Sequence, residues 1–74
     1  MIYKKPNAAV QVKATGRLLR LIDGYITDSD RQVIRYKLLS CSWERFTNMV
    51  HLYLSGYLSK TEEEIDEFLK NQLI

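Results

Sequence analysis

Beyond the first 26 residues, apolar positions follow the three- and four-residue spacings of amphipathic helices. Thr27 can cap a helix from about Asp28 to Leu39, because Asp30 follows it by three residues and places a second acid in the first turn. Ser42 can cap the next helix. The apolar face of that helix is the clearest pattern in the chain and comprises Trp43, Phe46, Met49, Val50, Tyr53, Leu54 and Tyr57.

The end of the chain predicts one more helix. Gly56 lies where a left-handed cap would end the aromatic helix. Ser59 and Glu62 then have the spacing of a capping box, which opens a helix. The buried face of this last helix is expected to consist of Ile65, Phe68, Leu69 and Leu73.

The first 26 residues allow two interpretations. Apolar and polar residues alternate over residues 9–14, which is typical of a strand, and Thr15 then caps a helix over residues 16–23. Alternatively, a single long helix runs through this segment and tolerates Gly16, which costs about 1 kcal/mol relative to alanine. Either way, residues 1–74 form one mainly α-helical domain, in which three to four short helices follow the N-terminal strand if it forms.

Composition excludes several classes of function. With Cys41 as its only cysteine and His51 as its only histidine, the chain can form no internal disulfide and no metal or iron–sulfur site of its own. We expect no cofactor. No motif for a phosphate loop or a catalytic nucleophile is present, so we expect no catalytic site and no enzyme. No apolar run approaches the roughly 20 residues of a membrane span, and the opening residues are too polar for a secretory signal, which indicates a cytoplasmic protein.

Charge is distributed unevenly along the chain. Residues 1–45 hold nine Lys and Arg against four Asp and Glu, a net charge of +5, whereas residues 46–74 hold two against five, a net charge of −3. A basic surface of this size suits an anionic partner such as double-stranded DNA, and the acidic half would be repelled by it.

The order of elements in residues 9–39 resembles the ribbon-helix-helix family of DNA-binding repressors: an alternating strand, a short helix, a glycine and a second capped helix. The resemblance implies that two chains pair their strands into a ribbon that lies in the DNA major groove. It further implies that Ala9, Gln11 and Lys13 face the bases, where Gln and Lys can bond adenine and guanine. Arg17 and Arg20 would then contact phosphates.

A second resemblance begins later in the chain. Residues 30–39 and 42–46 look like the opening of a helix-turn-helix of the sigma-factor region 4 type. The helix that would then enter the groove, over residues 62–70, carries five acids, which phosphates repel. The first resemblance therefore fits the charge pattern better.

These observations predict a non-enzymatic, DNA-binding transcriptional regulator that acts as a homodimer through its basic N-terminal half. The alternative is a small helical module that docks on another protein, as an inhibitor or adaptor, through its aromatic face and uneven charge. The residues expected at an interface with another chain are Val10 and Val12 from the paired strand, and Trp43, Tyr53 and Tyr57 from the aromatic face.

Overall fold

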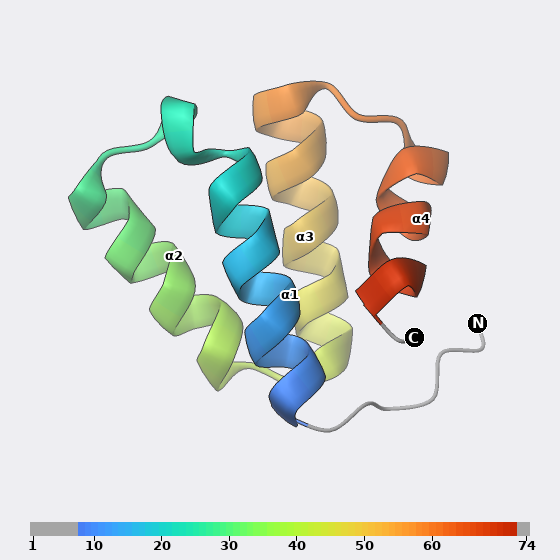
Figure 1. Ribbon diagram of the computed structural model, residues 1–74, viewed down its shortest axis with the longest axis horizontal. Coiled ribbons are helices and arrows are strands. Elements are labelled where there is room, and N and C mark those ends of the chain that lie inside the picture. Colours follow the sequence, from blue (N-terminus) through green and yellow to red (C-terminus); the bar gives the residue numbers. More distant parts are fainter. Residues whose placement is uncertain (1–7, 73–74) are drawn as a thin grey trace.

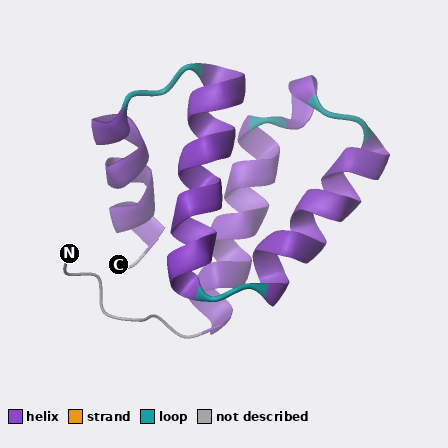
Figure 2. Cartoon of the chain, turned by 180° about the vertical axis from the view of Figure 1, so that it is seen from behind, coloured by secondary structure: helices purple, strands orange, loops and turns teal. Residues whose placement is uncertain are grey.

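The computed structural model describes residues 8–72, over which the chain forms four α-helices and one turn of 3-10 helix (Figure 1). The elements are α1 (Ala8–Leu21), η1 (Asp23–Tyr25), α2 (Asp28–Ser40), α3 (Trp43–Leu58) and α4 (Glu62–Gln72). Figure 2 shows helices and loops only, with no strand in the described part of the chain. The prediction of a mainly helical fold is confirmed.

The strand expected over residues 9–14 is not formed, because these residues belong to α1. Their alternation is overridden by burial. Ala14 and Leu18 in α1, and Ile22 directly after its end, recur every four residues and are completely buried. Thr15 is not a helix cap either. Its hydroxyl donates to the carbonyl of Gln11, 2.8 Å away within the same helix. The long first helix that the sequence left open is therefore the correct alternative.

The caps of α2 and α3 are those predicted from the sequence. The Thr27 hydroxyl accepts from the backbone N–H of Asp30 at 3.0 Å, and the Asp30 carboxylate accepts from the N–H of Thr27 at 3.3 Å. Ser42 accepts from the N–H of Arg45 at 3.3 Å. Both caps satisfy N–H groups that a helix start would otherwise leave unpaired.

The connection between α3 and α4 differs from the prediction in its register. Helix α3 does not end at Gly56 but runs on to Leu58, and Ser59 takes the left-handed conformation with φ 54°. Ser59 therefore cannot cap α4, because an N-cap residue is normally extended. The capping box lies two residues later, where Thr61 and Glu64 exchange hydrogen bonds of 3.0 and 3.2 Å.

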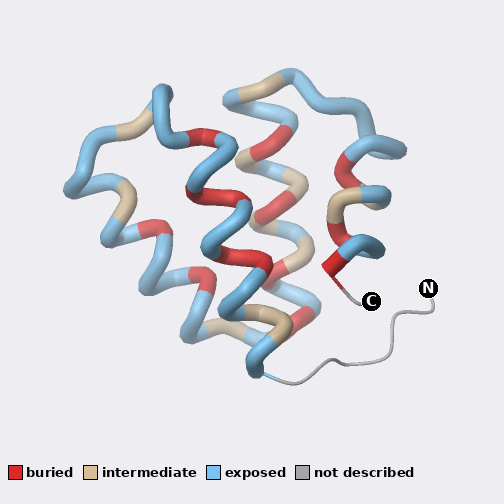
Figure 3. The backbone as a smooth tube through the Cα atoms, viewed as in Figure 1, coloured by how far each residue is buried: buried red, intermediate tan, exposed pale blue. Residues whose placement is uncertain are grey.

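Helix α1 lies in the middle of the fold and contacts α2, α3 and α4 (Figure 1). Figure 3 shows the buried positions of α2 on its side toward α1, and those of α4 on its side toward α3. Phe46 is completely buried at the centre of the core and stacks on Trp43, with ring centroids 5.0 Å apart. This arrangement leaves one long side of α1 exposed between α2 and α4.

Candidate nucleic-acid interface

The exposed side of α1 and the neighbouring edge of α2 form a groove of about 470 Å³, here called the basic groove. Helix α1 supplies three cations at spacings of four and three residues, so they share one face. Helix α2 supplies two more, four residues apart. The lining residues are Val12, Lys13, Gly16, Arg17, Leu19, Arg20, Arg31 and Arg35.

The five cations of the basic groove are almost uncompensated. No Asp or Glu of residues 8–72 lines the groove, and the nearest acid in the ion pairs is Asp23, which binds Nη2 of Arg31. The Nε of Arg31 is buried and has no hydrogen-bond partner in the described part of the chain. Because the positive charge of these side chains is not balanced by any acid of residues 8–72 in the lining, the groove attracts anions.

The side chains of the basic groove suit the binding of phosphate. Guanidinium groups bind phosphate oxygens through two parallel hydrogen bonds, and an ammonium binds them as a point charge. Apart from these five cations, the groove is lined by Val12, Leu19 and Gly16, which offer no side-chain hydrogen bond. The groove can therefore neutralise a chain of negative charges.

The basic surface continues from α1 toward the end of α4. Arg17 and Arg20 also line a hollow of about 520 Å³, together with Leu21, Phe68, Asn71 and Gln72. The amide of Gln72 is buried and donates to the carbonyl of Phe68 at 2.9 Å. A neighbouring hollow contains Glu64 and Glu67, which mark the acidic limit of this surface.

The sequence placed Gln11, Lys13, Arg17 and Arg20 in one nucleic-acid site, and the structure brings three of them together in the basic groove. Gln11 lies elsewhere. It is half-buried, and its Nε2 donates to the backbone carbonyls of Leu38 at 2.6 Å and Cys41 at 2.9 Å. Its amide nitrogen joins the start of α1 to the end of α2, and it does not lie with the other three predicted site residues.

The residues expected at an interface with another chain are scattered. Trp43 is only 8% exposed and belongs to the protein's own core, while Val10 and Tyr53 are half-buried against that core. Burial raises the pKa of the Tyr53 phenol above its ordinary value of 10.0. Val12 and Tyr57 are 52% and 37% exposed, so these two remain available to a partner. The paired ribbon implied by the first resemblance requires residues 9–14 to be extended, and they are helical.

Arg31 and Arg35 were not predicted from the sequence to belong to the nucleic-acid site. Their spacing of four residues on an amphipathic helix nevertheless indicates a shared face. The local signal says only that the two cations lie together. That they face the cations of α1 depends on how α1 and α2 pack, which a sequence pattern does not specify.

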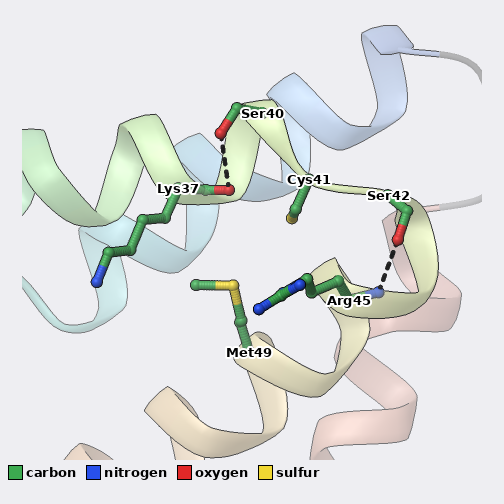
Figure 4. A pocket seen from close by; sticks show the side chains of 6 residues that line it. All are labelled: Lys37, Ser40, Cys41, Ser42, Arg45 and Met49. Carbon is green, nitrogen blue, oxygen red and sulfur yellow. Dashed lines mark hydrogen bonds between the residues drawn. The ribbon is translucent and has the colours of Figure 1, made fainter.

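Another hollow, of about 650 Å³, lies where α2 ends and α3 begins (Figure 4). Figure 4 shows the thiol of Cys41 pointing from the turn toward the side that Arg45 and Met49 line. The sulfur lies 3.5 Å from the carbonyl of Leu38. Lys37 and Arg45 add two more cations to this end of the molecule.

Comparisons with protein-family models, curated proteins and solved structures found no match to this chain. Within residues 8–72, no cluster of three or more His, Cys, Asp or Glu side chains is arranged to hold a metal ion. Over the same residues, no helix has the length and apolar character needed to cross a membrane. The chemistry of the basic groove is therefore the feature of this chain that points to a function.

Proposed function

We propose that this protein binds double-stranded DNA by its phosphate backbone, through the basic groove between α1 and α2, in a regulatory rather than a catalytic role. The observation that carries the proposal is the meeting of five Lys and Arg side chains in one groove that no carboxylate of residues 8–72 lines. Such a surface exchanges condensed counterions for its own charges, which drives binding to any phosphodiester chain.

Two features limit recognition of base sequence by the groove, although its Arg and Lys side chains can bond guanine as well as phosphate. The charged side chains of the groove have no Asn, Gln or hydroxyl neighbour in its lining. The amide nitrogen of Gln11 is committed to the carbonyls of Leu38 and Cys41. Since phosphate contacts carry no sequence information directly, we expect affinities for duplexes of different sequence to agree within a few-fold.

The proposal is tested by fluorescence anisotropy with a labelled duplex of about 20 bp, titrated between about 50 and 200 mM NaCl. With all five cations engaged, the logarithm of the binding constant should fall with the logarithm of salt concentration at a slope of about −4 to −5. Replacing Arg17 and Arg20 together by glutamine should reduce the steepness of that slope by about two.

A matched control variant replaces Lys60 and Lys70 by glutamine, which removes the same charge from exposed positions outside the basic groove. Its salt slope should equal that of the parent protein. The proposal is refuted if the parent binds no duplex at tens of micromolar at the lowest salt, or if the control variant loses as much affinity as the groove variant.

The same titration distinguishes DNA from an acidic protein surface, which is one partner that the basic half of the chain would suit under the protein-docking alternative. Poly-L-glutamate offers negative charge without phosphate geometry. Because paired guanidinium groups fit phosphate oxygens, the parent protein should bind the duplex more tightly than poly-L-glutamate of equal charge. The opposite order would favour the docking module.

A further inference from the structure

Gly16 lies at a position where neither the backbone nor the packing of this chain requires glycine. It is exposed in the middle of α1, and its φ is that of an ordinary helical residue. A Cβ atom built at this position meets no atom within 4 Å. Glycine destabilises a helix interior relative to alanine, so the fold would be more stable with a side chain here.

The residues around Gly16 indicate which kind of ligand could occupy the space that a side chain would fill. Gly16 follows Lys13 by three residues and precedes Arg20 by four, so it lies between these two cations on the same face of α1. Arg31 and Arg35 line the same groove from α2. At Gly16, between these cations, no side chain of the described part of the chain covers the backbone of α1.

We infer that Gly16 is the point at which the sugar-phosphate backbone of bound DNA rests directly on α1, an inference that depends on the proposed function. Without a side chain at residue 16, a phosphate can approach the helix backbone and lie within reach of cations from both helices at once. The backbone N–H groups of a helix interior are already paired, so the gain comes from shorter distances between phosphate and cations. A side chain at this position would hold the phosphate outward and lengthen those distances.

The test compares Gly16→Ala and Gly16→Leu with Gly56→Ala. Gly56 is the matched control, because it too is an exposed helical glycine whose added Cβ meets nothing within 4 Å, and it lies outside the basic groove. Gly16→Ala and Gly56→Ala should each raise the melting temperature, by up to about 4–8 °C. Anisotropy titrations with the labelled duplex then report affinity.

Of the two alanine substitutions, only the one at residue 16 should raise the melting temperature and lower the affinity for DNA. We expect Gly16→Ala to lose about threefold and Gly16→Leu about tenfold or more in duplex affinity, whereas Gly56→Ala binds like the parent. If Gly16→Leu binds as tightly as the parent while the Arg17 and Arg20 variant is impaired, the groove binds DNA and this inference is wrong. If the parent itself binds no duplex, the proposed function fails, and the inference fails with it.

Discussion

Replacing Gln11 by alanine removes the two hydrogen bonds that tie the first turn of α1 to the last turn of α2. The acceptors are the carbonyls of Leu38 and Cys41, at 2.6 and 2.9 Å from Nε2. They lie at the C-terminal end of α2, where backbone carbonyls have no partner within their own helix. The substitution therefore removes the donor that satisfies two carbonyls at a helix end.

The expected loss of stability follows from the net contribution of each hydrogen bond to the free energy of unfolding. A hydrogen bond of this kind contributes roughly 0.5–1.5 kcal/mol, so the pair contributes about 1–3 kcal/mol. The better helix propensity of alanine offsets roughly 0.4 kcal/mol of this loss. We expect a net decrease of about 0.6–2.6 kcal/mol in the free energy of unfolding, which lowers the urea midpoint by a similar number of molar units at a slope near 1 kcal/mol per molar.

Urea unfolding followed by circular dichroism measures the change, with Gln32→Ala as the control. Gln32 is exposed on α2, and its substitution should change stability by less than about 0.5 kcal/mol. The reasoning is refuted if the Gln11 and Gln32 variants have the same midpoint. It is also refuted if folded Gln11→Ala ranks duplexes of different sequence differently from the parent, since that result would identify Gln11 as a base-reading residue.

Three further predictions concern the core, the cap of α4 and association. Phe46→Ala should cost roughly 3–5 kcal/mol, about the whole stability of so small a domain, and its circular dichroism at 25 °C should show an unfolded chain; a melting curve like the parent's would contradict the buried position of Phe46. The hydrogen bond from the Thr61 N–H to Glu64 lowers the pKa of Glu64 below its ordinary 4.5. The ionised carboxylate therefore stabilises the fold above pH 4.5, and this stabilisation is lost as the pH falls through the lower pKa of Glu64 in the folded state. Glu64→Gln should flatten the pH dependence of the urea midpoint below pH 4.5, and an unchanged profile would count against this cap. The homodimer stays a prediction, although residues 9–14 offer no strand edge for it; light scattering at micromolar concentration decides it, and a monomer mass would exclude it.

Local sequence was sufficient where the interaction itself is local. Thr27 and Ser42 cap their helices as predicted, because the side chain and the N–H that it accepts from are three residues apart. The aromatic helix was recognised for the same reason, since its buried face repeats within the segment. The uneven charge of the two halves was likewise visible from composition alone.

Tertiary packing decided what two locally equivalent patterns left open. Residues 9–14 alternate like a strand, yet the burial of Ala14, Leu18 and Ile22 against the other helices stabilises a helix through this segment. The sequence predicted a capping box at Ser59 and Glu62. The left-handed end of α3 at Ser59 excludes that box, and Thr61 and Glu64, which have the same spacing, form it instead.

The candidate site depends on both levels. The sequence grouped Lys13, Arg17 and Arg20 in one site, but expected Lys13 on a strand. These three cations share a face because residues 8–21 form a single helix, in which they are four and three residues apart. Only the packing of α1 beside α2 added Arg31 and Arg35, and only that packing turned Gln11 inward to carbonyls 27 and 30 residues away in the chain. Contacts between residues so far apart are specified by the summed burial of the whole core, which no short window of sequence contains.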